Sequence, residues 1–154
     1  MDVRELYRDV ILDHNRSPRN MGRLDPYDAS AVGNNPLCGD ALSLTLRLAG
    51  DRLSEVRFNG QGCAISIASA SLMGEAVSGK SVQEIDALHR EVHALLTESG
   101  YVPALPLGKL MALGGVREYP VRVKCASLCW HTLQAALHAP ANAQAPATVS
   151  TEQP

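Results

Sequence analysis

The strongest constraint on the fold is an alternating stretch at residues 42–48, followed by a second one at residues 55–59. In both stretches apolar residues occupy every second position, and polar or charged residues lie between them. A period of two is typical of a strand with one buried face, and Gly50-Asp51 between the stretches favours a tight turn. The sequence therefore predicts an antiparallel hairpin with one apolar face.

Candidate metal ligands flank this hairpin. Cys38 and Asp40 come just before its first strand, and Cys63 comes just after its second. Because a hairpin brings its two open ends together, we expect these three residues to be neighbours. A fourth candidate, Cys125, lies far along the chain. Three thiolates and one carboxylate suit tetrahedral zinc or an iron–sulfur cluster, and the absence of any Cys-x-x-Cys pair excludes a zinc ribbon or finger.

Helices are predicted for most of the remaining chain. Helical spacing of apolar residues and helix-end signals place them at residues 3–14, 66–77, 82–96 and 126–137, with a short helix near Leu110. Ser81 and Glu84 have the spacing of a capping box. Residues 15–36 form a polar stretch. The alternation at residues 121–123 predicts a short extended piece, with Cys125 at the start of the last helix.

Length and charge limit the class of protein. The 154 residues suffice for one domain, expected at residues 1–138, and the Ala/Pro-rich residues 139–154 are expected to be a disordered tail. The net charge of −2 gives no bulk attraction to nucleic acid or to an anionic membrane. No apolar run could span a bilayer, and the charged N-terminus lacks a signal-peptide core. We therefore expect a cytoplasmic protein, in which four cysteines are more typical of metal binding or reactivity than of disulfides.

Several motifs are specific enough to indicate a family. They are Asp13-His14, Ser17-Pro18-Arg19-Asn20, Asn35-Pro36-Leu37-Cys38-Gly39-Asp40, Phe58-Asn59-Gly60-Gln61-Gly62-Cys63-Ala64-Ile65-Ser66, Ala68-Ser69-Ala70-Ser71 and Pro120-Val121-Arg122-Val123-Lys124-Cys125-Ala126 with Trp130. With them the chain resembles the U-type (NifU/IscU-like) iron–sulfur cluster assembly proteins over roughly residues 3–138. Lys124 stands where the IscU scaffold branch usually has histidine, and residues 83–107 fit an insertion typical of the SufU branch.

The resemblance implies an α+β, SufE/NifU-like fold: a small antiparallel sheet of about three strands, covered on one face by helices. It also implies a zinc-dependent sulfurtransferase that accepts persulfide sulfur from a SufS-type cysteine desulfurase and passes it to the SUF cluster assembly complex. Carried over by motif, Cys38, Asp40, Cys63 and Cys125 are the zinc ligands, and Cys38 is the sulfur acceptor. A monomer or weak homo-oligomer is expected.

Two other functions remain open at this point. An IscU-like scaffold would assemble a [2Fe–2S] cluster, or hold iron, on the same four residues. A metal-stabilised structural domain would transfer nothing. Within a zinc site Asp40 is the weakest-matched ligand, because a hard carboxylate stands among soft thiolates. Cys38 lies on a Gly-containing loop and is the ligand expected to move.

Residues outside this ligand set have less specific roles. Arg122 is expected to point toward the site and offset its negative charge, on the same strand face as Lys124; the alternative is a solvated face. Cys129 is interpreted as a packed helical cysteine, with a resolving thiol or substitute ligand as the alternative. His89 and His93, four residues apart, favour a solvent-facing helix side over a metal pair. His131 could approach Cys125.

Overall fold

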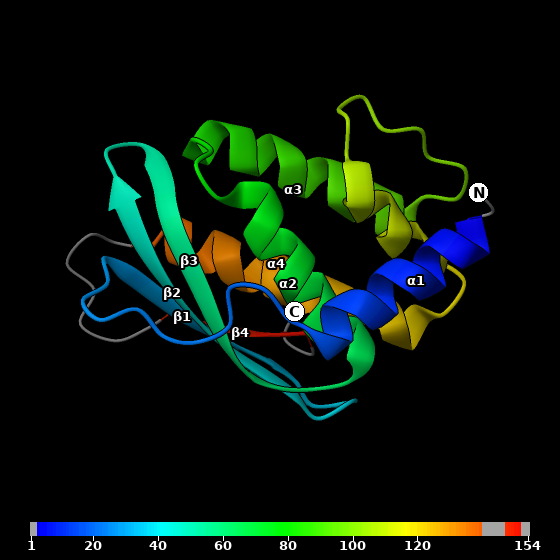
Figure 1. Ribbon diagram of the computed structural model, residues 1–154, viewed down its shortest axis with the longest axis horizontal. Coiled ribbons are helices and arrows are strands. Elements are labelled where there is room, and N and C mark those ends of the chain that lie inside the picture. Colours follow the sequence, from blue (N-terminus) through cyan, green and yellow to red (C-terminus); the bar gives the residue numbers. More distant parts are fainter. Residues whose placement is uncertain (1–2, 140–146, 152–154) are drawn as a thin grey trace.

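The computed structural model describes residues 3–139 and 147–151, and combines a four-stranded sheet with helices (Figure 1). The helices are α1 (Val3–Arg16), α2 (Ala64–Val77), α3 (Val82–Thr97), the 3₁₀ helix η1 (Gly108–Val116) and α4 (Pro120–Leu137). The strands are β1 (Ala29–Asn35), β2 (Asp40–Ala49), β3 (Arg52–Gln61) and β4 (Ala147–Ser150). The predicted α+β class is confirmed.

The sheet has the strand order β3-β2-β1-β4. The predicted hairpin is confirmed as β2 and β3, which pair antiparallel with Leu44 opposite Phe58. Alternation buries Leu42, Leu44 and Leu46 of β2 on one face, and burying a leucine contributes about 1.5–3 kcal/mol. On the opposite face Glu55 forms ion pairs with Arg47 and Arg57, and all three side chains are partly exposed. The sheet therefore has one apolar and one polar face.

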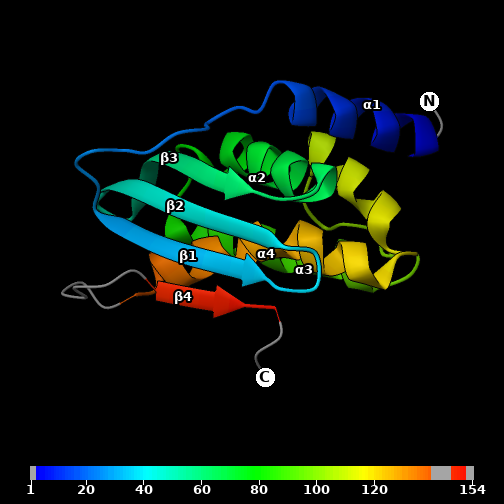
Figure 2. The ribbon, with the colours of Figure 1, turned by 90° about the horizontal axis from the view of Figure 1, so that it is seen from below.

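Helices α2 and α4 cover the apolar face, as seen where the sheet lies in front of them (Figure 2). Helix α2 is buried almost all round, and its small residues permit close packing on its neighbours. Trp130 of α4 is 1% exposed and is the largest side chain in the core. Helix α1 packs on α2 and η1, so that it lies at one margin of the helical layer.

Two strands were not expected. Strand β1 lies in the predicted polar stretch, and its inward positions Ala31, Gly33 and Asn35 are too small or polar to give an apolar alternation. Strand β4 lies in the predicted disordered tail, where it pairs parallel with β1. The sheet thus has four strands rather than about three, and one pairing is parallel. The other residues of the predicted tail, 140–146 and 152–154, lie outside the described residues.

The last helix also differs from the prediction. Helix α4 begins at Pro120, so residues 121–123 are helical rather than extended. Proline is favoured in the first helical turn because its fixed φ suits the helix and its missing N–H would have no partner there. The predicted capping box of α3 is confirmed, with Ser81 Oγ accepting from the Glu84 N–H at 3.1 Å. Among the described helices, none is long and apolar enough to cross a membrane.

Candidate metal centre

The β1–β2 turn places Cys38 and Asp40 at one end of the sheet. Asn35 pairs with Asp40 across the two strands, so the four residues between them form a tight turn. Gly39 in this turn has a φ of 73°, a left-handed conformation that favours glycine. The hairpin brings Cys63 next to this turn. The backbone N–H of Cys63 donates a hydrogen bond to Asp40 Oδ1 at 2.9 Å. The expected proximity of these residues is therefore found.

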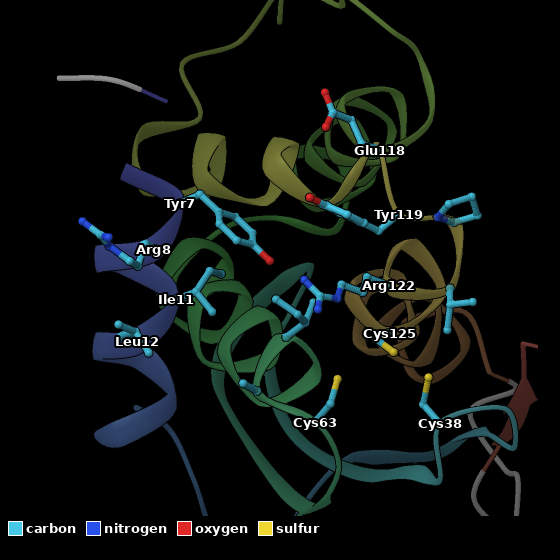
Figure 3. Close-up of a pocket in the computed structure, with 14 residues that line it drawn as sticks. Tyr7, Arg8, Ile11, Leu12, Cys38, Cys63, Glu118, Tyr119, Arg122 and Cys125 are labelled. Carbon is cyan, nitrogen blue, oxygen red and sulfur yellow. The ribbon is translucent and has the colours of Figure 1, made fainter. Parts of the chain in front are cut away.

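Helix α4 supplies the fourth candidate from the other side. Ligand atoms of Cys38, Asp40 and Cys125 all lie within 4.8 Å of one another. Cys125 and Asp40 are buried, whereas Cys38 and Cys63 are partly exposed. Within the described residues this close group does not extend to Cys63, whose sulfur lies beside the same cavity as the other two sulfurs (Figure 3).

Asn35 connects the candidate ligands to each other and to the C-terminal strand. Its side chain is fully buried, and Nδ2 donates to Asp40 Oδ2 at 3.1 Å and to Cys125 Sγ at 3.5 Å. Its Oδ1 accepts from the Thr151 hydroxyl at 3.0 Å, just after β4. Both carboxylate oxygens of Asp40 are thus held, one by Asn35 and one by the Cys63 N–H.

The chemistry of this donor set fits a soft or borderline cation. Burial is the main cause that raises the pKa of Cys125, and the neighbouring Cys38, Asp40 and Cys63 raise it further. A thiol in such surroundings becomes a thiolate only when a positive charge stabilises it. Zinc or an iron–sulfur cluster supplies that charge, and both accept three sulfur donors with one other ligand.

An apolar cavity of about 710 Å³ opens beside the three sulfurs. Tyr7 and Ile11 of α1 line one wall, and Tyr119 and Arg122 at the start of α4 line another (Figure 3). The Arg122 guanidinium carbon lies 5.0 Å from the centre of the Tyr119 ring, a cation–π distance. Arg122 extends into the cavity in the direction of Tyr7 (Figure 3).

The family description "NifU-like N terminal domain" matches residues 6–139. The chain belongs to this family. The zinc-dependent sulfurtransferase SufU of Bacillus subtilis (strain 168) is 42% identical over 130 residues, which cover 84% of this chain and 87% of the relative. The iron–sulfur cluster assembly scaffold protein IscU of Streptococcus pyogenes serotype M1 is 40% identical over 143 residues, covering 92% and 89%.

Solved structures agree with this membership. A crystal structure from Fervidobacterium islandicum AW-1, assigned to iron–sulfur cluster assembly in the SUF system, matches with a TM-score of 0.79 and 32% identity over 86% of this chain and 97% of that one. The N-terminal NifU-like protein of Brucella abortus matches with a TM-score of 0.79 at 23% identity, covering 88% and 94%, and supports the fold alone. The predicted family is confirmed.

Within this NifU-like domain, some residues lie differently from the prediction. Arg122 and Lys124 belong to a helix, so they are separated by about 200° around its axis rather than sharing a strand face. By contrast, Cys129 is packed within α4 as interpreted: it is fully buried with its sulfur 3.4 Å from Ser69 Oγ, and burial raises its pKa to about 12. His131 contacts the histidines of α3, where His93 is exposed but His89 is half-buried rather than solvent-facing as predicted.

The sequence interpretation assigned no role to Asn35, Thr151 or Tyr119. Asn35 falls in the motif that carries Cys38, but a polar residue before a turn is common, and nothing local indicates a buried amide. Thr151 follows a strand that was not predicted, so its contact could not be anticipated. Of these three residues, Tyr119 alone had a signal in the sequence. It is an aromatic residue next to Pro120 and three positions before Arg122.

Proposed function

We propose that the chain is a zinc-dependent sulfur carrier of iron–sulfur cluster assembly. It accepts sulfur from a SufS-type cysteine desulfurase and passes it to the SUF cluster assembly complex. The observation that carries this proposal is the position of Cys38, a partly exposed thiol beside an apolar cavity, within 4.8 Å of donor atoms of Asp40 and Cys125. A ligand with that exposure can both bind a metal and meet a partner.

The proposed zinc ligands are Cys38, Asp40, Cys63 and Cys125. When bound, zinc keeps the thiols deprotonated and lowers their reactivity. Asp40 is the hard donor in a soft set, and therefore the weakest-matched ligand. Its two hydrogen bonds, from Asn35 and from the Cys63 N–H, hold the carboxylate in place despite this mismatch.

Cys38 is the proposed sulfur acceptor because it sits in a turn, whereas Cys125 is fixed within α4 and Cys63 occupies the N-cap position of α2. Docking of the desulfurase frees the Cys38 thiolate from the ligand set. Cys38 Sγ then attacks the outer sulfur of the desulfurase persulfide. A new sulfur–sulfur bond forms on Cys38, the original one breaks, and the electron pair leaves with the desulfurase thiolate.

The cavity supports partner docking at this point. Val121 and Leu12 on its rim are 52% and 40% exposed, so apolar surface is available next to Cys38. Arg122 lines the same cavity. Its proposed role is electrostatic support, because three thiolates and a carboxylate around Zn²⁺ leave a net charge of about −2.

A second candidate function is a scaffold that assembles a [2Fe–2S] cluster on the same ligands. The donor set is compatible with it, since three thiolates and one other ligand hold clusters of this type. The similarity to the IscU scaffold of Streptococcus pyogenes favours it. Lys124, at the place where the scaffold branch usually has histidine, argues for the carrier.

Metal content and desulfurase stimulation distinguish these functions. The carrier is expected to purify colourless with about one zinc per chain, and to accelerate a SufS-type desulfurase. Cys38→Ser should abolish the acceleration, whereas the matched control Cys129→Ser should keep both zinc and acceleration. Brown protein containing iron would support the scaffold, and acceleration that survives Cys38→Ser would overturn the assignment of Cys38.

Shielding of Cys38 provides a second test. Alkylation of Cys38, followed by mass spectrometry, should be slow in the zinc protein and rapid once the desulfurase is added. Equal labelling with and without the desulfurase would contradict release of Cys38 on docking. Labelling of Cys63 serves as an internal control, because it stays a ligand in both states.

A further inference from the structure

Three histidine rings meet where α3 packs on α4, on elements separate from the β1–β2 turn. His89 and His93 lie one turn apart on α3, and His131 comes from α4. Their ring centres are separated by 5.3 Å (His89 to His131), 6.1 Å (His93 to His131) and 6.4 Å (His89 to His93). All five histidines of the chain are described, so three of the five gather at one place.

This spacing is close to that of imidazoles sharing a metal ion. With metal–nitrogen distances of about 2.0–2.1 Å, the ring centres of two ligands on a tetrahedral ion lie about 5 Å apart. As the rings now stand, these three described residues offer no set of nitrogens that all lie within 4.8 Å of one another. The nitrogens can converge by ring rotation, because the terminal torsion of histidine has a broad energy profile.

The surroundings leave the rings available as ligands. The His89 Nδ1 atom is buried and has no hydrogen-bond partner. Burying a polar nitrogen without a partner costs free energy, and coordination of a metal by this nitrogen would offset that cost. His93 is exposed and gives an ion access from solvent. The nearby Asp86 is already engaged by His138 at 2.9 Å, so the available donors are imidazole nitrogens.

Protonation does not compete strongly with a metal here. Burial and the two neighbouring histidines lower the pKa of His89 to about 4, and burial with His93 nearby lowers that of His131. Two charged groups of α3 also act on the pKa of His89 in opposite directions: Asp86 raises it and Arg90 lowers it. At His89 and His131, neutral imidazole, the form that binds metal, therefore predominates near neutral pH.

We propose that His89, His93 and His131 form a second metal site, which binds a divalent first-row transition cation such as Zn²⁺ or Co²⁺ through three imidazoles. Imidazole donors suit these cations, whereas Mg²⁺ and Ca²⁺ prefer oxygen. Three protein ligands leave a fourth position for water or another donor, unlike the four-residue set around Cys38. The site is independent of the sulfur-carrier proposal, since it shares none of its residues.

Cobalt titration of the full-length protein that carries one zinc per chain, at the cysteines, tests the proposal. Co²⁺ at three imidazoles gives weak visible bands, whereas Co²⁺ that replaces zinc at the cysteines gives strong thiolate charge-transfer absorption. We expect one additional Co²⁺ per chain without the charge-transfer band. Replacement of zinc by Co²⁺ at the cysteines is thus detected by its own absorption band. Absence of Co²⁺ binding at the histidines can therefore be distinguished from absence of metal binding at the cysteines.

Variants assign the ligands. His89→Gln, His93→Gln and His131→Gln should each weaken binding of the additional ion by more than about tenfold, because even the loss of an outer-shell partner of a metal site typically costs 10- to 100-fold. The matched control His138→Gln removes the histidine that follows α4 at its C-cap, outside the trio, and should bind like the wild type. His93 is exposed, so its variant should fold even if changes at the two half-buried positions perturb packing. No additional ion in the wild type, or equal binding in His93→Gln and His138→Gln, would show that the rings only pack together.

Discussion

The Thr151 hydroxyl donates a hydrogen bond to Asn35 Oδ1 at 3.0 Å, and this contact ties the segment after β4 to the candidate metal centre. On its other side, the same Asn35 amide donates to Asp40 and to Cys125. A residue near the C-terminus is therefore one hydrogen bond away from the group that orients two candidate ligands. Groups in such positions commonly tune how tightly a site holds its metal.

Replacing Asn35 with alanine should make the metal labile. The change leaves Asp40 Oδ2 and Cys125 Sγ without the donor they share, and loss of such a partner typically costs 10- to 100-fold in metal affinity. Zinc transfer to a chromogenic chelator should accelerate by about that range. Asn34→Ala, at the exposed neighbouring position of β1, is the matched control. Equal zinc loss in the two variants would contradict the role of Asn35.

Thr151→Val should have a smaller effect in the same assay. It removes one hydrogen bond, worth about 1 kcal/mol, while keeping the shape of the side chain. Zinc release should accelerate by no more than about fivefold, and the unfolding midpoint should change little. If release in Thr151→Val matched the wild type while Asn35→Ala was fast, the amide would be held without help from the C-terminal segment.

Asp40→Ala should change metal lability more than the fold. Asp40 is fully buried, and its carboxylate accepts from Asn35 and from the Cys63 N–H, so its loss frees both donors. Zinc exchange should be faster than in the wild type, while circular dichroism should remain that of a folded protein. Unchanged exchange of labelled zinc would show that Asp40 is not a ligand.

Arg122→Gln should lower desulfurase stimulation without removing zinc. The variant keeps a polar side chain in the cavity and loses only the charge proposed to offset the ligand set. We expect a several-fold lower stimulated rate, of the order of an exposed charge interaction. Arg57→Gln, on the polar face of the sheet, is the control. Stimulation that fell equally in both variants would point to net charge rather than to the cavity.

Gly33→Ala should destabilise the fold. A methyl group at this position of β1 would lie 2.1 Å from Thr132 Oγ1 and 3.1 Å from Leu128 Cδ1 of α4. Forcing extra volume into such a contact typically costs 1–3 kcal/mol, which chemical denaturation can measure. The double variant Gly33→Ala/Thr132→Ala should recover part of the loss, because it removes the nearest clash. No difference between Gly33→Ala and the wild type would mean that β1 and α4 adjust without strain.

Acidification should destabilise the metal-free protein below about pH 6.5. Burial lowers the pKa of His14, His89 and His131 in the folded state, so the unfolded chain binds more protons once the pH falls through the normal histidine range. For His89 the loss extends to about pH 4, its folded-state pKa. Denaturant midpoints at pH 7, 6 and 5 should fall in that order, and His89→Gln should flatten the trend. A trend unchanged by His89→Gln would place the acid sensitivity elsewhere.

Features set by local physical chemistry were predictable from the sequence. The period-two leucines define β2 because no other regular backbone puts alternate side chains on one face. The Ser81 capping box uses neighbours three residues apart, and it forms as expected. The proximity of Cys38, Asp40 and Cys63 also followed locally, since a hairpin must bring its own ends together. Resemblance of the motifs supplied the family and the expectation about Cys125.

Tertiary structure decided the features that depend on distant partners. Three alternating residues after Pro120 fit a strand or a helix equally well, and packing of α4 on the sheet selects the helix. The tail segment that forms β4 has little apolar content of its own, and it becomes a strand because the edge of β1 offers backbone hydrogen-bond partners. The buried Asn35 network and the histidine trio exist only once these elements meet. The sequence thus determined which donors are available, and long-range packing determined which of them share a site.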